Sequence, residues 1–391
     1  MDLHTLYQGR CPAGDYDQYM KFIDLVFRFE PGPESGFLHI LPKLYKPCYH
    51  PCENAIVLKE NGRILAAAGI FPMEAHIGGQ SLKVFGIGNV SVHPEARSRG
   101  YMKQVMNAAL REMIAQGGAY SALGGLRSRY QYFSYERCGQ SFRFFVTPNG
   151  IQHQIGGVAP LALREVLEPG PALDEISRLQ SAAPLHFCRG EGTETLDVLH
   201  SWGSVPYAAY SGGEIAGYIV YQKNPAQISE FRVKPGYEDA LLSACVGTFG
   251  KEDGLSFLFH PYDTGYLPYF FSRCESYTVG DNENFSVFCF EAVLRAFLAL
   301  KSRLHPLADG TLSVLIHGIA GDEALTLRVT HGIAKVSKGL SQEAGTPFME
   351  LDHLAAMRFF FRGHAAERNA LPLQIAAWFP LPLAQPHLDE V

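Results

Sequence analysis

The chain has 391 residues, of which 47% are hydrophobic and 18% are charged, so it is long enough for two or three globular domains. Its formal net charge of −6 argues against a nucleic-acid-binding protein, because phosphate contacts need a basic surface. The eight cysteines are scattered and do not suggest a disulfide framework. No signal-peptide pattern opens the chain, and no apolar run approaches the roughly 18 residues of a membrane span. A cytoplasmic protein without membrane contact is expected.

The first part of the chain alternates hydrophobic runs with strong turn signals. Asn61-Gly62 and Gly78-Gly79 each predict a tight hairpin turn between two strands. A helix before them is expected to end at Pro31-Gly32-Pro33. The predicted elements, in chain order, are a helix over Phe22–Phe29, strands over Asn54–Leu58, Ile64–Phe71 and Leu82–Val92, a helix over 101–116 and a strand over Tyr120–Leu123.

The segment Val84–Met113 predicts a strand, a short loop and a helix with one buried face. The loop is Glu95–Gly100, and the helix after it has apolar residues at i, i+3, i+4 and i+7 spacing. A helix start offers unpaired backbone N–H groups and the positive end of the helix dipole, which suits a pyrophosphate. Arg97 and Arg99 add positive charge, and Gly100 permits close approach of the backbone.

This segment resembles motif A of the GCN5-related N-acetyltransferases (GNAT superfamily), where Arg/Gln-x-x-Gly-x-Gly/Ala holds the pyrophosphate of acetyl-coenzyme A (acetyl-CoA). Arg97, Gly100 and Met102 occupy the three marked positions. Met102 departs from the usual small residue, which is consistent with a larger side chain packing beside the helix start. With the lead-in Val90–Pro94 and the downstream segment Arg129–Glu136, the chain is similar to the enhanced-intracellular-survival branch, whose members have three parts.

The resemblance implies an α+β protein of three domains. Residues 1–145 would be the catalytic GNAT domain with a mixed sheet. Residues 146–285 would be a degenerate GNAT-like domain, because Ser211–Val220 resembles Asn61–Ile70 but no Arg-x-x-Gly follows it. Residues 286–391 would be a sterol-carrier-protein-like α+β domain with a tail that reaches the active site.

The sequence of these later parts supports several elements. A strand over Ile228–Lys234, a turn at Pro235-Gly236 and a helix from Glu238 repeat the earlier strand–turn–helix order. Thr278–Asn284 is polar and predicts a domain boundary. The last part predicts a helix over Ala292–Leu300, strands over Leu312–His317, Ala324–Val329 and Ile333–Lys338, a buried helix over Leu351–Phe361, and a tail at Trp378–Leu383 that is too proline-rich for a helix.

The resemblance also assigns the cofactor and acid residues. Acetyl-CoA, as co-substrate, would contact the strand end, the loop and the helix start: Val90, Ser91, Val92, Arg97, Ser98, Arg99, Gly100, Tyr101 and Met102. A backbone N–H near Val90 would polarise the thioester carbonyl. Tyr130 matches the general acid of the family, since a neutral tyrosine can protonate a departing thiolate. Tyr132 and Tyr135 are competitors for this role.

The general base is less clearly marked, because the strand FGIGNVSV before the loop contains no carboxylate. In the resembled family the terminal carboxylate folds back into the site, which assigns the role to Val391. Asp389 and Glu390 are alternatives. His93 is expected to be a loop histidine and not the base. No metal site is predicted, and the cluster at Cys48 and Cys52 is expected to hold reduced thiols.

The predicted function is an acetyl-CoA-dependent N-acetyltransferase that acts on a primary amine of a small molecule, a lysine or a peptide. The amine would attack directly in a ternary complex, since no cysteine beside a recognisable base suggests a covalent enzyme intermediate. One alternative is a non-catalytic protein that senses acetyl-CoA or a hydrophobic ligand. A further alternative is that residues 286–391 form a lipid carrier. Assembly into a homo-oligomer is an expectation from the resemblance.

Overall fold

The structure is a computed structural model that describes residues 6–30, 35–251 and 253–391. The predicted helix break at Pro31-Gly32-Pro33 lies outside the described residues. The chain divides into two compact units. The first unit comprises Met1–Cys138, Glu283–Leu381 and Glu390–Val391, and the second comprises Gly139–Asn282 and Pro382–Asp389. Within the described ranges, every helix is too short or too polar to cross a membrane.

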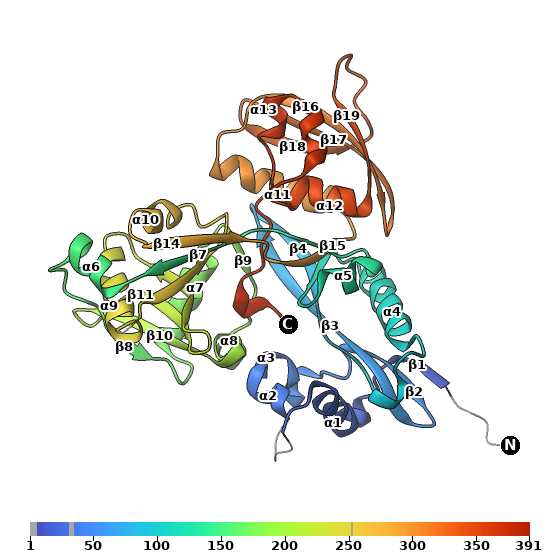
Figure 1. The fold of residues 1–391 in the computed structure, drawn as a ribbon, viewed down its shortest axis with the longest axis horizontal. Helices are drawn as coiled ribbons and strands as arrows, with labels where there is room; N and C mark the ends of the chain where they lie inside the picture. Colours follow the sequence, from blue (N-terminus) through green and yellow to red (C-terminus); the bar gives the residue numbers. More distant parts are fainter. Residues whose placement is uncertain (1–5, 31–34, 252) are drawn as a thin grey trace. The chain divides into compact units, whose positions relative to one another are not determined.

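The main sheet of the first unit is mixed, as predicted. Its strands lie in the order β1-β2-β3-β4-β5-β15-β6 (Figure 1). Strands β4 and β5 are parallel, and the other neighbours along this path are antiparallel. The strand bounds are β1 Leu6–Arg10, β2 Ala55–Glu60, β3 Arg63–Ile77, β4 Gln80–Val92, β5 Tyr120–Leu123, β6 Glu136–Cys138 and β15 Glu283–Val287. Both predicted hairpin turns are confirmed, because Glu60 pairs with Arg63 and Ile77 pairs with Gln80.

Helix α4 (Tyr101–Ala115) covers strands β2, β3 and β4 of this sheet. Its predicted apolar face is confirmed, since Val105, Met106, Ala109 and Met113 are buried in the core beneath it. Helix α1 begins at Tyr16, six residues before the predicted start, and ends at Phe27. The other helical segments are η1 Ala13–Asp15, α2 Gly36–Ile40, α3 Pro42–Tyr45, η2 Pro47–Tyr49, η3 Pro94–Ala96, α5 Arg127–Tyr130 and η4 Gln131–Phe133.

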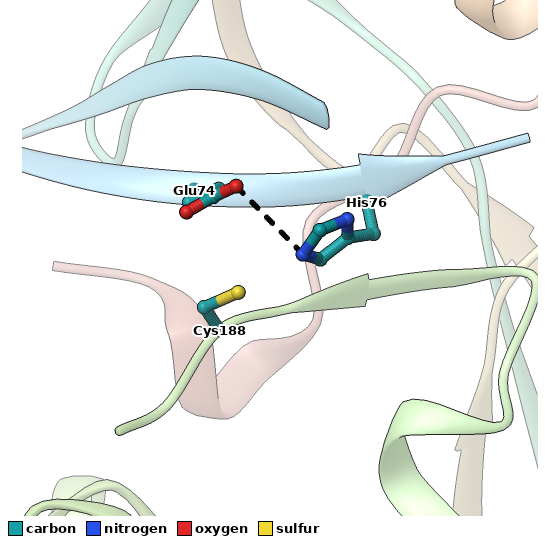
Figure 2. A group of neighbouring side chains, drawn as sticks. All are labelled: Glu74, His76 and Cys188. Atoms are coloured by element: carbon teal, nitrogen blue, oxygen red, sulfur yellow. Dashed lines mark ion pairs between the residues drawn. The ribbon is translucent and has the colours of Figure 1, made fainter. Parts of the chain in front are cut away.

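The far end of the β3–β4 hairpin carries a small polar group. Glu74 and His76 both lie on β3, and His76 Nε2 is 3.8 Å from Glu74 Oε1 (Figure 2). The Ser81 hydroxyl on β4 donates to the same carboxylate. Both side chains are more than a third exposed, so this ion pair contributes little to stability. Cys188, also labelled in Figure 2, belongs to the second unit.

A smaller sheet of four strands follows in the first unit, in the order β18-β17-β16-β19. Its strands are β16 Gly310–Gly318, β17 Gly321–Thr330, β18 Ile333–Lys338 and β19 Phe348–Asp352, and its helical segments are α11 Phe290–Leu304, α12 His353–Phe361, η6 Ala366–Ala370 and α13 Leu373–Ala376. The three predicted strands and both predicted helices are present. The second helix starts at His353 and not at Leu351, because Leu351 pairs with Ile316 as part of β19. Helix α11 contacts this sheet as well as β3 and β4, which joins both sheets in one unit.

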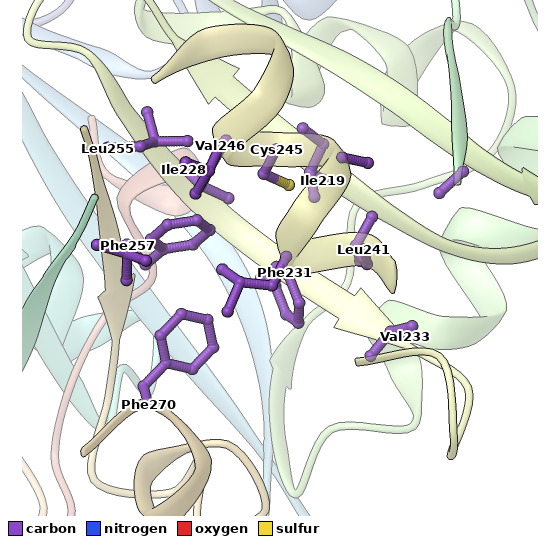
Figure 3. Packing of buried hydrophobic residues seen from close by; sticks show 14 of the residues in the cluster. Ile219, Ile228, Phe231, Val233, Leu241, Cys245, Val246, Leu255, Phe257 and Phe270 are labelled. Atoms are coloured by element: carbon purple, nitrogen blue, oxygen red, sulfur yellow. The ribbon is translucent and has the colours of Figure 1, made fainter. Parts of the chain in front are cut away.

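The second unit is built on a mixed sheet in the order β14-β7-β13-β12-β11-β10-β8. Its strands are β7 Ser141–Val146, β8 Ala162–Glu165, β9 Leu185–Phe187, β10 Ser204–Ser211, β11 Glu214–Gln222, β12 Gln227–Val233, β13 Leu255–Phe259 and β14 Ser276–Gly280. Its helical segments are α6 Pro148–Ile155, α7 Pro171–Ser181, α8 Thr193–Leu199, η5 Ser201–Gly203, α9 Glu238–Phe249, α10 Leu267–Phe271 and η7 His387–Asp389. Leu241, Cys245 and Val246 of α9 pack with Ile228 and Phe231 of β12 in the core (Figure 3).

The two large sheets share one topology. Three antiparallel strands, a helix and a parallel strand follow one another as β2-β3-β4-α4-β5 in the first unit and as β10-β11-β12-α9-β13 in the second. Each sheet then adds two strands beside the parallel one, β15 and β6 in the first and β7 and β14 in the second. The chain therefore repeats a strand–helix order that the sequence echo at Ser211–Val220 indicated.

The expected domain boundaries fall inside strands. The boundary at 145/146 lies within β7, and the boundary at 285/286 lies within β15. The polar segment Thr278–Asn284, interpreted as a boundary turn, supplies the end of β14 and the start of β15. Its backbone groups are satisfied by pairing with strands that are distant in the sequence, which polarity alone does not reveal.

Candidate active site

Strands β4 and β5 separate part of the way along β4. They are paired at Val84 with Tyr120, Phe85 with Ser121, and Gly86 with Ala122. Beyond Gly86, β4 continues to Val92 and pairs with β3 on its other side. The backbone groups of this part of β4 that face β5 are therefore available to a bound molecule, as far as the described residues show.

Asn89 fixes the shape of β4 at this point. The β3–β4 register shifts here, and Asn89 has a φ of 42°, a left-handed conformation that asparagine tolerates better than most residues. Its Oδ1 accepts a hydrogen bond from the Gly69 N–H at 3.1 Å. Its Nδ2 donates to the hydroxyls of Tyr19 at 2.7 Å and Tyr45 at 2.6 Å. This role of Asn89 was not predicted, although a single polar asparagine inside the apolar run FGIGNV was the available signal.

A pocket of about 800 Å³ lies between the free edge of β4 and the start of α4. Eight of the nine predicted cofactor-binding residues line it: Val90, Ser91, Val92, Arg97, Ser98, Gly100, Tyr101 and Met102. Gly100 has a φ of 76° directly before the helix, and a Cβ there would meet nothing within 4 Å. The requirement for glycine at this position is thus conformational and not a matter of space.

Arg99 is the ninth predicted residue, and it does not line the pocket. Its Nη1 is 3.2 Å from Glu60 Oε2 on β2, and its guanidinium lies 6.0 Å from the centre of the Tyr101 ring. The backbone turns between the two arginines, where Ser98 has a φ of 65°, so that Arg97 lines the pocket while Arg99 pairs with Glu60. The interpretation of both arginines as pocket cations is corrected to Arg97 alone.

The pocket contains two further cations and two aromatic rings that were not among the predicted cofactor-binding residues. Lys103 and Arg129 line it together with Tyr132 and Phe133. Lys103 Nζ lies 5.1 Å from the centre of the Tyr132 ring. Lys103 is in the first turn of α4, and this position beside a candidate anion site was the signal that could have identified it. Three cationic side chains around one pocket suit a ligand with several phosphate charges.

Tyr130 lies at the end of α5, beside the pocket and largely buried. Its ring packs against Gly125, where a Cβ would be 2.9 Å from Tyr130 Cε2, and meets the Tyr135 ring edge-on at 6.5 Å. Burial raises the pKa of the Tyr130 hydroxyl, and Arg129 partly offsets this, so the hydroxyl keeps its proton at neutral pH. Tyr130 is not itself a lining residue, but its neighbours Arg129 and Tyr132 are.

The competing tyrosines have different surroundings. Tyr132 is largely exposed and contributes to the pocket wall. Tyr135 is fully buried, and its hydroxyl forms a hydrogen bond with the hydroxyl of Ser121 on β5. Of the three, Tyr130 combines a protonated hydroxyl with a position at the end of β5.

The C-terminal residue of the chain lies against β4 at the point where the strands separate. A Cβ on Gly86 would be 2.7 Å from Val391 Cγ1, and a Cβ on Gly88 would be 3.6 Å from the Val391 carboxyl carbon. Lys43 Nζ donates to the Glu390 carbonyl oxygen at 2.6 Å. Glycines at 86 and 88 thus leave the room that the terminal residue fills.

Asp389 was an alternative base, and its contacts do not fit that role. It is buried in the second unit, where it accepts hydrogen bonds from Arg189 Nε at 3.0 Å and Nη2 at 2.8 Å. Arg189 also pairs with Glu230, whose carboxylate accepts from the Tyr218 hydroxyl. A carboxylate held this way is a structural ion pair and not a free proton acceptor.

His93 and Cys52 contact other groups of the protein. His93 Nδ1 accepts a hydrogen bond from the Glu95 N–H at 3.3 Å, and Nε2 is 2.7 Å from Arg63 Nη2. Cys52 is buried beside Cys11, and the hydrogen bond between the two thiols raises the pKa of Cys11. Cys48 is exposed.

Comparisons with known proteins show a family match for part of the first unit and a similar fold for nearly the whole chain. Residues 10–141 match a family model described as an acetyltransferase (GNAT) domain. The comparison with curated proteins gives no match.

Several solved structures are similar over nearly the whole chain. A GCN5-related N-acetyltransferase from Kribbella flavida is 16% identical over 99% of each chain, with a TM-score of 0.68. One from Anabaena variabilis is 17% identical over 99% of this chain and 100% of that chain, also with a TM-score of 0.68. Eis1 from Mycobacterium abscessus is 13% identical over 100% of this chain and 99% of that chain, with a TM-score of 0.59. At these identities the likeness concerns the fold.

The predicted fold of the first domain is thus confirmed by the family match and by the mixed sheet with its separated β4 and β5. Residues 10–141 therefore form an acetyltransferase (GNAT) domain, and the likeness to solved structures extends the shared fold over nearly the whole chain.

Proposed function

We propose that the protein transfers the acetyl group of acetyl-CoA to a primary amine by direct attack in a ternary complex. The observation that carries this proposal is the pocket of about 800 Å³ that joins the free edge of β4 to the start of α4. Acetyl-CoA supplies an acetyl thioester on an elongated chain that ends in phosphates. An open strand edge suits the amide-bearing arm of such a molecule, and a helix start with cations suits the phosphates.

Each residue has a defined part in this proposal. Arg97 and the N–H groups around Gly100 hold the pyrophosphate, while Lys103 and Arg129 add positive charge to the same pocket. A backbone N–H near Val90 donates to the thioester carbonyl and stabilises the negative charge that develops on its oxygen. Tyr130 gives its proton to the departing thiolate.

The amine is proposed to approach from the side of β4 where Val391 lies. The terminal carboxylate beside Gly88 would attract the ammonium form of the acceptor and can take its proton. This negative charge favours a cationic amine, whether of a small molecule, a lysine or a peptide. It also supports the more specific proposal that the protein belongs to the enhanced-intracellular-survival branch.

We further propose that the second unit is a degenerate GNAT-like domain that does not bind acetyl-CoA. Its helix α9 starts with Glu238 and Asp239, and the Glu238 carboxylate accepts from the Gly236 N–H at 2.8 Å. The Val233 N–H at the end of β12 donates to the Tyr266 hydroxyl at 3.1 Å. The positions that would hold phosphate and pantetheine are therefore occupied by the protein's own groups.

The four-stranded sheet with α11 and α12 is proposed to be the sterol-carrier-protein-like domain. Its α+β composition supports this assignment. Lipid that copurifies with the native protein would support a carrier role for it.

The test is a thiol-release assay with acetyl-CoA and a panel of amines. We expect the wild-type protein to release coenzyme A with at least one amine. Tyr130→Phe should lower the turnover number by about 10-fold or more while the Kd for acetyl-CoA stays unchanged, because general acid catalysis contributes roughly 10²- to 10⁴-fold. A chain without Glu390 and Val391 should also lose turnover, and Tyr277→Phe, an exposed tyrosine of the second unit, is the control.

Binding of acetyl-CoA without thiol release for any amine would contradict the proposal. That result would favour the non-catalytic sensor.

A further inference from the structure

The start of strand β15 is attached to the turn that follows β5. Asn284 pairs with Leu123 of β5, and its side-chain Nδ2 donates to the carbonyl oxygens of Leu123 at 3.2 Å and Gly125 at 3.0 Å. Glu283, the first residue of β15, is paired with Cys138 of β6 on the other side. These contacts fix the backbone of Glu283 beside Gly124 and Gly125.

The Glu283 carboxyl group borders the same short segment after β5 as the proposed general acid. A Cβ on Gly124 would be 3.9 Å from Glu283 Oε2, and a Cβ on the following Gly125 would be 2.9 Å from Tyr130 Cε2. The carboxyl and the phenol therefore border two consecutive glycines at the end of β5. Glu283 Oε2 is buried and has no hydrogen-bond partner among the residues that the structure describes.

The surroundings of Glu283 favour its protonated form. Burial and the negative charge of Glu390 raise the pKa of the Glu283 carboxyl to about 8, and Arg137 on β6 partly opposes this. Of the other titratable groups of the proposed site, Tyr130 borders Gly125 with its ring, and the Val391 carboxyl carbon would be 3.6 Å from a Cβ on Gly88. A carboxyl that titrates near the working pH is a more effective proton acceptor than one that is ionised throughout.

We propose that Glu283 is the proton acceptor for the amine in acetyl transfer. This inference rests on the proposed function. The ammonium group of the acceptor gives one proton to the Glu283 carboxylate, and the neutral nitrogen forms a bond to the thioester carbonyl carbon. The C–S bond breaks, Tyr130 protonates the thiolate, and the nitrogen loses a second proton, which restores Tyr130 through solvent. Overall, the ammonium ion and acetyl-CoA yield an amide, coenzyme A and one proton.

The other candidate carboxyl groups are assigned different parts. Strand β4 carries no carboxyl side chain between Gly86 and Val92, and the Asp389 carboxylate forms an ion pair with Arg189. In this assignment the Val391 carboxylate holds the ammonium ion by charge only, and Glu283, in place of Val391, removes the proton. A bound cation would stabilise ionised Glu283, so binding of the ammonium substrate favours the carboxylate form that accepts the proton.

The experiment compares wild type, Glu283→Gln and Glu283→Asp with two kinds of acceptor. An alkyl amine of the lysine type, with a pKa of about 10.4, is protonated at pH 7.5 and needs a base. An aromatic amine is neutral at that pH and does not need a base. We expect Glu283→Gln to lower kcat/KM for the alkyl amine by about 100-fold, in line with general base catalysis. The same substitution should change kcat/KM for the aromatic amine by less than about 10-fold. Glu283→Asp should retain part of the alkyl-amine activity.

Two controls accompany this comparison. The Kd for acetyl-CoA and the melting temperature should stay unchanged in Glu283→Gln, which excludes a folding effect. Glu74→Gln, an exposed glutamate on β3, should behave as wild type for both amines. For wild type, kcat/KM for the alkyl amine should rise with pH through about 8, and this inflection should be absent in Glu283→Gln.

Equal loss for both amines, or an unchanged pH profile in Glu283→Gln, would overturn the assignment of Glu283 while the proposed acetyl transfer stands. Absence of thiol release from the wild-type protein with either amine would instead count against the proposed function, and the inference would fall with it.

Discussion

Val391 packs its side chain against Gly86 of β4, so that a Cβ on Gly86 would be 2.7 Å from Val391 Cγ1. Gly86 is also the last residue of β4 that pairs with β5. The end of the chain and the point of strand separation are thus one place in the first unit. Val391 fits there because position 86 has no side chain.

Substitution of Gly86 tests this relationship. Gly86→Ala should displace Val391 and lower kcat/KM for amine acetylation by about 10-fold or more, since a shift of about 1 Å can cost 10²-fold in rate. The Kd for acetyl-CoA should change by less than about twofold. Steady-state kinetics and calorimetric titration would measure the two effects. Gly14→Ala is the matched control, because a Cβ there meets nothing within 4 Å.

The two loop arginines should differ in their effect on cofactor binding. Arg97 lines the pocket, whereas Arg99 is paired with Glu60. Arg97→Ala should raise the Kd for acetyl-CoA by about 10- to 100-fold, because a hydrogen bond to a charged group contributes about 1.5–3 kcal/mol. Arg99→Ala should change this Kd by less than about threefold. Equal losses in the two variants would show that the loop is arranged differently around the ligand.

Asn89 should be important for stability. Asn89→Ala leaves the buried Gly69 N–H and the hydroxyls of Tyr19 and Tyr45 without their partner and places alanine at a φ of 42°. The free energy of unfolding should fall by about 3 kcal/mol, since each unsatisfied buried group costs about 1–3 kcal/mol and part of this is relieved by relaxation. Urea denaturation would measure it.

A glycine variant separates the two contributions at this position. Asn89→Gly keeps the left-handed conformation and loses the same hydrogen bonds, so it should be about 1 kcal/mol more stable than Asn89→Ala. A fully stable Asn89→Ala protein would contradict the role of the side chain.

His353 should make the first unit sensitive to acid. Burial lowers the pKa of His353 to about 4, and contacts with the Ser134 backbone and Asp352 only partly oppose this. The unfolded chain takes up the proton near pH 6.5, so stability is fully present above that pH and decreases as the pH falls from about 6.5 to about 4. The resulting decrease in the free energy of unfolding should reach at most about 3 kcal/mol.

The comparison that isolates this effect is between wild type and His353→Gln, because glutamine does not titrate. The difference in free energy of unfolding between the two proteins should change between pH 6.5 and pH 4 and be constant above pH 7. A constant difference over the whole range would contradict the assignment of a neutral, buried His353.

The loop Glu95–Gly100 could be predicted because its features are local. Strand, loop and helix are consecutive between Val84 and Met113, and the helix start and the glycine at 100 depend on neighbours in sequence. The hairpins at Asn61-Gly62 and Gly78-Gly79 are predictable for the same reason, since two residues set the turn. Within this loop the orientation of Arg99 could not be read, because its partner Glu60 is on a separate strand.

The local sequence by itself therefore determined the hairpins, the loop and the helix that border the pocket, whereas the mixed sheet and the fold class were expected from the family resemblance. Only the tertiary structure decided which side chains meet at the end of β5. Glu283 is 153 residues beyond Tyr130 in the chain, and its place depends on β15 pairing with β5 and β6. Such pairing is selected by the burial of the whole sheet and by backbone hydrogen bonding between distant segments, and no local pattern of residues encodes it.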